Sequence, residues 1–225
     1  MIVRILSLAA LLTGISSAQA LIVPFTEEFS GNASGWLTGT SQSPTWNSTG
    51  GADGGSYISA EATMTPAGFG AALFRGNATS DASGDTFVGN WLSAGVTLFS
   101  AFIRHNAEQP LDIFARLDAG SGRAASSVGF TVPTNQWFPI SLPIVDSTTS
   151  FQSYGQPPTG FSIVFTNIQN VQFFASPSSP AGTFRFDLDK VSVVPEPGTL
   201  GLLGLAVALL VYAGARQRLR SAQNK

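Results

Sequence analysis

The middle of the chain is dominated by alternation of apolar and polar residues at every second position. In the run 111–118, Leu, Ile, Ala and Leu alternate with Asp, Phe, Arg and Asp, and the runs 96–103 and 184–189 show the same period. Successive side chains of a β-strand point to opposite faces, so a period of two predicts strands with one face buried. These three runs are the clearest predicted strands.

Other short apolar runs predict further strands, at 22–29, 56–62, 71–74, 127–132, 137–142, 161–165 and 171–174. Clusters of Gly, Pro, Asn, Asp and Ser separate them, for example at 50–55 and 176–182. No amphipathic helix of useful length is evident. Roughly ten short strands joined by tight turns predict an all-β fold, an antiparallel β-sandwich of the jelly-roll type.

The N-terminus has the three parts of a secretory signal peptide. Met1–Arg4 is short and basic, residues 5–15 are mostly apolar, and Ala18-Gln19-Ala20 places small residues at the −3 and −1 positions of a cleavage site. We expect residues 1–20 to be removed and the mature chain to begin at Leu21. An uncleaved N-terminal anchor is the alternative.

The C-terminus predicts a single membrane-spanning helix. Residues 198–215 are uncharged and rich in Leu, Ala, Val and Gly, and as a helix they reach about 27 Å, just enough to cross a hydrocarbon core. Arg216, Arg218 and Arg220 follow directly. Basic residues beside a span stay in the cytoplasm, so the C-terminus is expected inside and the β domain outside.

The segment before this span carries a recognisable motif. Pro195-Glu196-Pro197, the apolar span and the Arg-rich end together resemble a PEP-CTERM sorting signal, over residues 195–225. The resemblance implies processing by an exosortase, a membrane-embedded enzyme of Gram-negative bacteria that make extracellular polysaccharide. It also implies a cell-surface protein that is held in the membrane before processing.

Composition limits what residues 21–194 can do. This region is long enough for one domain with a sizeable core, and the chain has no cysteine, so stability must come from packing. Six basic and twelve acidic residues give residues 21–194 a net charge of −6. Without a basic stripe, we expect no nucleic-acid partner.

A second resemblance concerns the fold of residues 21–194. Trp46, residues 50–59 and residues 74–77 look like the start of a laminin-B-like β module. Residues 25–29 with Trp36, and residues 186–191, look like the first and last strands of galactose-binding-like jelly rolls. The resemblance implies that the two terminal strands pair. It is an analogy of fold, which transfers no function.

The residues that enzymes use are scarce. The chain has no thiol, one histidine (His105) and no G-x-S-x-G motif, so a catalytic triad is not predicted and His105 is expected to be structural or merely exposed. Asp187 and Asp189 face one side of one strand, whereas glycosidase carboxylates flank the substrate from two sides. They are predicted to be a solvated strand face. We expect a protein that is not an enzyme, with a glycoside-acting enzyme as the weakest alternative.

Carboxylates also suggest structural calcium, which takes oxygen ligands. If the first and last strands are neighbours, Glu28 and Asp189 are predicted to share one Ca²⁺ ion. The loop with Asn77, Asp81 and Asp85 is a weaker candidate because it lacks the spacing of an EF-hand.

Two functions fit the exported domain. The first is a structural or adhesive module of the cell surface or biofilm matrix. The alternative is a carbohydrate-binding module for extracellular polysaccharide, in which exposed aromatic rings stack on sugars. The aromatic candidates are Trp36, Tyr57, Trp46, Trp91, Trp137 and Tyr154. Strand aromatics more often pack in a core or on a sheet, so this is the expected role of these six.

Overall fold

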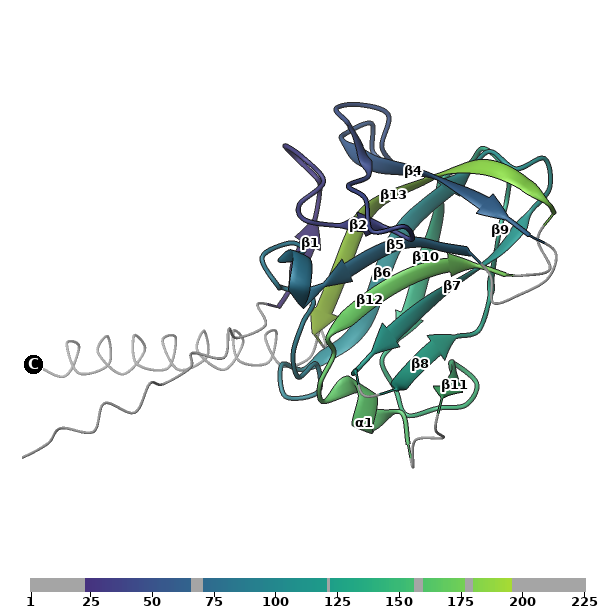
Figure 1. Cartoon of the computed structure of the whole chain (residues 1–225). Helices are drawn as coiled ribbons and strands as arrows, with labels where there is room; N and C mark the ends of the chain where they lie inside the picture. Colours follow the sequence, from purple (N-terminus) through teal and green to yellow (C-terminus); the bar gives the residue numbers. More distant parts are fainter. Residues whose placement is uncertain (1–22, 66–70, 121, 156–159, 177–179, 196–225) are drawn as a thin grey trace, which may run out of the picture.

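A computed structural model describes residues 23–195 except 66–70, 121, 156–159 and 177–179. Two antiparallel sheets pack face to face as a β-sandwich, which confirms the predicted all-β class (Figure 1). The predicted signal peptide and membrane span lie outside the described residues. Within the described part, no helix is long and apolar enough to cross a membrane.

The first sheet is built around the last strand and is called the β13 sheet. Its strands run in the order β10-β6-β13-β4-β3, and β1 pairs with β13. Their bounds are β1 Phe25–Glu27, β3 Thr45–Asn47, β4 Tyr57–Met64, β6 Val96–His105, β10 Phe138–Pro143 and β13 Gly182–Pro195. The predicted pairing of the terminal strands is confirmed, because Phe25 lies opposite Val193 and Glu27 opposite Val191.

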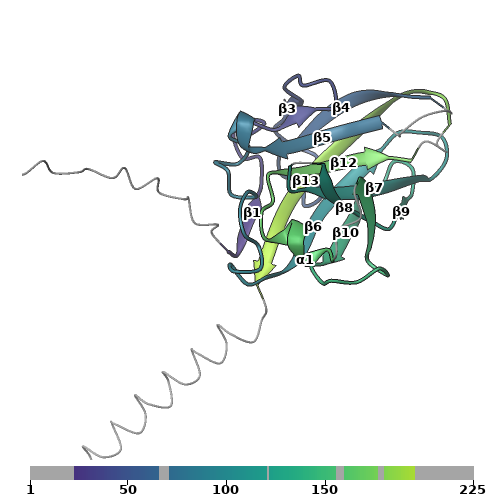
Figure 2. The same ribbon diagram turned by 60° about the horizontal axis from the view of Figure 1, so that its bottom comes forward.

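The second sheet is called the β12 sheet. It runs in the order β11-β8-β7-β12-β5-β2, and β9 pairs with β7. Their bounds are β2 Leu37–Thr38, β5 Ala71–Asn77, β7 Leu111–Asp118, β8 Arg123–Ser127, β9 Phe130–Val132, β11 Phe151–Gly155 and β12 Asn170–Ala175. A single 3-10 turn, η1 Ala78–Ser80, follows β5. Figure 2 shows the two layers from a second direction.

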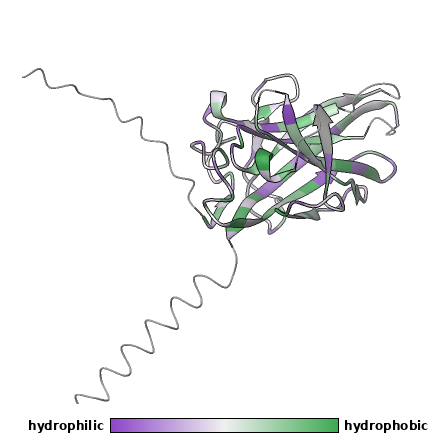
Figure 3. Cartoon of the chain, turned by 90° about the horizontal axis from the view of Figure 1, so that it is seen from below, coloured by the Kyte–Doolittle hydropathy of each residue, from purple (hydrophilic) through white to green (hydrophobic). Residues whose placement is uncertain are grey.

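Aromatic rings fill the space between the sheets. Phe99 on β6 stacks on Phe173 of β12 with ring centroids 5.9 Å apart, which joins the two sheets directly. Trp36 stacks on the same Phe173, and Trp91 packs against Phe99. All four side chains are fully buried. Apolar residues alternate with polar ones along the strands (Figure 3), as the period of two predicted.

Two predicted strands differ from the structure. The run 161–165 is wrong as a strand: Phe161 begins the one-turn helix α1 Ser162–Phe165. Phe161, Val164 and Phe165 have the i, i+3, i+4 spacing of one helical face, and all three are buried. Asp146 accepts the backbone N–H of Phe161 at 2.9 Å and so supports the start of the turn. The run 127–132 overlaps β9 and only the last residue of β8, because β8 begins earlier, at Arg123, and ends at Ser127.

Candidate functional site

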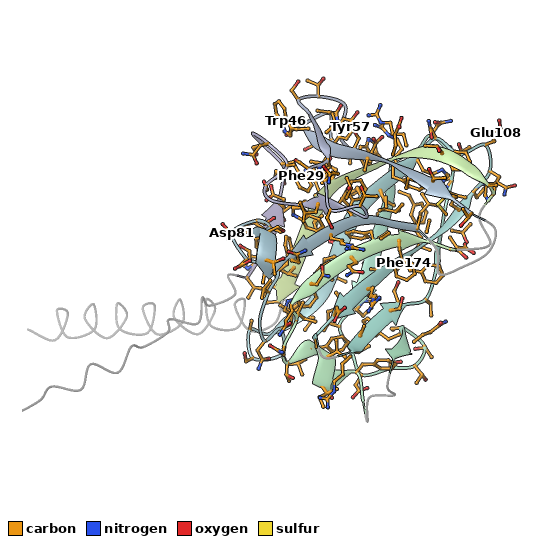
Figure 4. The ribbon with its side chains drawn as sticks, viewed as in Figure 1. Phe29, Trp46, Tyr57, Asp81, Glu108 and Phe174 are labelled. Atoms are coloured by element: carbon orange, nitrogen blue, oxygen red, sulfur yellow. The ribbon has the colours of Figure 1, made fainter. Side chains whose placement is uncertain are left out.

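The outer face of the β12 sheet carries two stacked phenylalanines. Phe114 of β7 and Phe174 of β12 are register partners, with ring centroids 5.1 Å apart and planes 11° from parallel. Both rings are only half-buried. Figure 4 shows Phe174 among the side chains of this sheet. Two flat apolar rings that remain open to solvent are a suitable surface for the apolar face of a ligand.

A row of polar side chains crosses four strands beside this Phe pair. Each member is the register partner of the next across β5, β12, β7 and β8, and the row consists of Arg75, Gln172, Arg116 and Ser126. Strand spacing of about 4.8 Å makes the row roughly 14 Å long. A site of this shape suits an extended ligand.

Several polar atoms on this face are buried without a hydrogen-bond partner among the described residues. They are Nε of Arg75, Oγ of Ser126 and, one row further along, Oδ1 of Asn170. An unsatisfied buried polar atom costs about 1–3 kcal/mol, and native proteins usually pair such atoms with protein, water or ligand. Three on one sheet face therefore favour a ligand that donates and accepts hydrogen bonds.

Local backbone features keep the Phe pair in place. A Cβ atom at Gly129 would lie 3.1 Å from the Phe114 ring, so the absence of a side chain there makes room for the ring. The pairing of β12 with β5 shifts its register between Phe173 and Phe174, whereas β12 keeps a regular register with β7. Because successive side chains of a regular strand alternate between its faces, Phe173 points into the core while Phe174 lies outside.

Phe114 and Phe174 are not among the sugar-stacking residues predicted from the sequence, which are all Trp or Tyr. A signal was nevertheless present. Phe114 interrupts the polar positions Asp112, Arg116 and Asp118 on the solvent-facing side of its strand. A large apolar residue on an otherwise polar strand face is the pattern that would have pointed to this site.

The aromatic residues that were predicted as sugar-stacking candidates have different environments. Trp36 and Trp91 are fully buried in the core and Tyr57 is 6% exposed, as expected for packing residues. Trp46 is 38% exposed and donates its ring N–H to the carbonyl of Phe29. Trp137 is half-buried beside Tyr57 on the β13 sheet. The side chain of Tyr154 lies outside the described residues.

The prediction that Asp187 and Asp189 form a solvated strand face is wrong. Asp187 is 4% exposed, and Asp189 is 1% exposed. Asp187 accepts the Nε–H groups of Arg104 and Arg185, each at 2.7 Å. Asp189 accepts the backbone N–H groups of Ala52 and Lys190. Both carboxylates are thus covered by hydrogen-bond partners, which the alternation of apolar and polar residues along the sequence cannot reveal.

Glu28 and Asp189 each bind Lys190, Glu28 through the ammonium group and Asp189 through the backbone N–H. The Lys190 ammonium is 3.3 Å from Glu28 and 2.7 Å from Asp53. The hydrogen bond from Lys190 lowers the pKa of Asp53. No group of three His, Cys, Asp or Glu residues suited to a metal ion occurs in residues 23–195 as described. Calcium binding by Glu28 and Asp189 stays a prediction, as does binding by the loop with Asp81.

His105 is a buried structural residue. Its Nδ1 accepts the backbone N–H of Ala107 at 3.2 Å, so Nε2 carries the proton and donates to the carbonyl of Val132 at 3.0 Å. The side chain is 1% exposed, and burial lowers the pKa of His105. The neutral imidazole is therefore part of the folded state.

The pH dependence of stability follows from this histidine. In the unfolded chain His105 has the ordinary histidine pKa of about 6.5 and binds a proton below it. The folded state excludes this proton, so the free energy of unfolding falls as pH falls. We expect the free energy of unfolding to fall by up to about 1.4 kcal/mol between pH 7.5 and 5.5 from this group alone. Chemical denaturation at several pH values measures it.

His105→Gln is the matched variant, because an amide can donate and accept in the same two directions. It should be less dependent on pH than the parent over this range. Burial raises the pKa of Asp189, so this group makes the folded state more stable as pH falls, the opposite of His105. Asp189 is present in both proteins, and its contribution therefore cancels in the comparison. An unchanged pH dependence in His105→Gln would contradict the assignment.

Comparison with known proteins identifies the C-terminal segment. Residues 193–218 match the PEP-CTERM protein-sorting motif. The resemblance carried by Pro195, Glu196 and Pro197 is thereby confirmed, and it indicates an exported cell-surface protein that is anchored in a membrane before processing. In the structure Pro195 is the last residue of β13. Glu196 and Pro197 lie outside the described residues.

Solved structures that align with this chain include an agarase, a xylanase fragment and carbohydrate-binding modules. An exo-β-agarase aligns with a TM-score of 0.52 and 8% identity, over 76% of this chain and 24% of the enzyme. A family 11 carbohydrate-binding module of a Clostridium thermocellum cellulase aligns with a TM-score of 0.47 and 16% identity, over 78% and 96%. A C. thermocellum xylanase fragment that contains a carbohydrate-binding module and was solved with xylohexaose gives 0.47 and 18%, over 77% and 28%.

The chain thus spans about a quarter of the length of the agarase and of the xylanase fragment. At these identities the agarase alignment shows a shared β-sandwich fold, consistent with the galactose-binding-like resemblance. No match was found among curated proteins.

Proposed function

We propose that this exported protein binds polysaccharide through the outer face of the β12 sheet. The single observation behind the proposal is the combination of the half-buried Phe114–Phe174 pair with the adjoining polar row. Sugars have an apolar C–H face that stacks on aromatic rings and a rim of hydroxyl groups that donate and accept hydrogen bonds. Both requirements are met on one surface.

The unpaired atoms strengthen this choice of ligand. Nε of Arg75 is a donor, Oδ1 of Asn170 is an acceptor, and Oγ of Ser126 is both. Hydroxyl groups can pair with all three, whereas a purely apolar ligand would leave them unpaired. An extended chain of sugars also matches a row that crosses four strands.

The proposed role is non-catalytic. Asp187 is occupied by two arginines and Asp189 by two backbone amides, which leaves neither carboxylate ready to transfer a proton to a substrate. His105 is buried with both ring nitrogens in use. These observations support a binding module. With an exosortase-type partner and a cytoplasmic C-terminus before processing, such a module would be an adhesive protein of the cell surface or matrix.

The test is a glycan array probed with the full chain in detergent, followed by titration of the best polysaccharide. We expect Phe174→Ala to weaken binding by about 2 kcal/mol, or roughly 30-fold in Kd, because one stacking ring is lost at the centre of the site. Phe114→Ala should have a similar effect.

Leu92→Ala is the matched control, because Leu92 is a large apolar side chain that is 42% exposed outside both sheets. It should bind like the parent. The proposal is wrong if no glycan on the array binds, or if the two Phe variants bind as tightly as Leu92→Ala.

A further inference from the structure

The β13 sheet carries a second polar site on its own outer face, away from the Phe pair. A pocket of about 240 Å³ lies where β4 begins and β6 ends, beside the first part of β13. Its lining residues are Tyr57, Arg104, His105, Asn106, Asn135, Arg185 and Asp187. Figure 4 shows Tyr57 at β4, while Phe174 belongs to β12 in the other sheet.

Two arginines in this pocket share one buried carboxylate. Oδ2 of Asp187 accepts from Nε of Arg104, and Oδ1 accepts from Nε of Arg185, both at 2.7 Å. Two positive charges thus face one negative charge, which leaves an excess of +1. Glu61 lies opposite Arg185 on β4, but it is exposed and does not line the pocket.

Aromatic rings hold the guanidinium groups in fixed planes. The Arg104 guanidinium lies 4.4 Å from the centroid of the Trp137 ring and 5.3 Å from that of Tyr57. Arg185 lies 5.7 Å from the Tyr57 ring and donates to the Tyr57 hydroxyl. Stacking limits the freedom of these side chains, so little entropy remains to be lost when a ligand binds.

Arg104 binds Asp187 through its Nε–H group. This leaves the outer edge of the guanidinium, which carries the two terminal nitrogens, available to a ligand. That edge is a planar pair of N–H donors, the geometry that recognises a carboxylate in two parallel hydrogen bonds. The Arg104 side chain is 25% exposed and that of Arg185 is 43% exposed, so both reach solvent from the pocket. The arrangement is preorganised for a small planar anion.

We propose that this pocket binds the carboxylate of an acidic sugar, such as a uronic acid unit of a polysaccharide. The carboxylate part of the inference rests on the two arginines and their excess charge. The sugar part rests on the proposed function, since it assumes that polysaccharide is the ligand. Within the described residues, this is a site distinct from the Phe114–Phe174 face.

The experiment titrates the full chain in detergent with a hexamer of galacturonic acid and with the methyl ester of the same hexamer. The acid should bind at least tenfold more tightly than the ester, which lacks the charge. Arg104→Gln should weaken binding of the acid by about 10- to 100-fold, because a hydrogen-bonded charge pair is lost. Arg104→Lys keeps the charge but not the planar fork, so its affinity should be intermediate.

Arg123→Gln is the matched control, since it removes the same charge from an exposed position on β8 in the other sheet. It should bind the acid like the parent. Arg185→Gln gives a second variant at a more exposed side chain, in case Arg104→Gln is unstable; melting temperatures verify the fold of each.

Equal affinities for acid and ester would overturn the proposal, and so would equal losses in Arg104→Gln and Arg123→Gln. Failure of the polysaccharide proposal has a different outcome. In that case Phe174→Ala leaves neutral-glycan binding unchanged, whatever the arginine variants do to the acid.

Discussion

Replacing Trp36 with alanine is expected to lower the free energy of unfolding by about 3–5 kcal/mol, the cost of removing a large aromatic side chain from a packed core. Trp36 is fully buried and stacks on Phe173, and its ring N–H donates to Ser83 at 2.9 Å. The ring also lies against Gly76, where a Cβ atom would be 2.9 Å away. For a domain of this size the loss corresponds to roughly 10–15 °C in melting temperature.

Trp46→Phe is the control for this experiment. Trp46 is 38% exposed, and the change removes mainly one hydrogen bond, to the carbonyl of Phe29. The expected cost is about 1 kcal/mol. Thermal and denaturant unfolding measure both variants. Equal losses in the two proteins would mean that Trp36 is not a central part of the core.

Deleting residues 196–225 is expected to change the location of the protein completely. The deletion removes the predicted apolar span and the basic residues after it while leaving β13 Gly182–Pro195 intact. The β domain should then be recovered as a soluble, folded protein, because the 18 uncharged residues that are predicted to hold it in the membrane are gone. Fractionation of cells into membrane, soluble and medium samples measures this.

A subtler variant separates anchoring from processing. Changing Pro195, Glu196 and Pro197 to alanine leaves the apolar length unchanged, so membrane insertion should persist while processing stops. If the variant that lacks residues 196–225 stays with the membrane, the anchor lies elsewhere in the chain. If the alanine variant is processed like the parent, the motif has no part in sorting.

The strand pattern was predictable for long strands with one buried face. The runs that begin at 96 and 111 appear as β6 and β7, because a half-buried strand must alternate apolar and polar residues. The short strands β2 and β3 were missed, since two or three residues are too few to show a period, and β11 Phe151–Gly155 was missed as well. The run 161–165 was mistaken for a strand because a short apolar stretch has no period that excludes a helical turn.

The sites were less predictable than the strands. Asp187 was identified as one of two carboxylates on a strand, but its partner Arg104 is 83 positions away in sequence and reaches it only across β6 and β13. Phe114 and Phe174 come together in the same way across β7 and β12. Neither pairing leaves a local signal, because strand order in an antiparallel sandwich is set by long-range contacts.

The sequence alone determined the all-β class, the pairing of the terminal strands by resemblance and the PEP-CTERM sorting segment. The class and the sorting segment depend on local information, a period of two and a motif, whereas the strand pairing came from the resemblance to jelly rolls. Only the tertiary structure decided which aromatic rings remain exposed, which carboxylates are buried, and which arginines share them. The physical reason is that burial and charge pairing on a sheet depend on the neighbouring strands, and the order of those strands is a property of the folded chain as a whole.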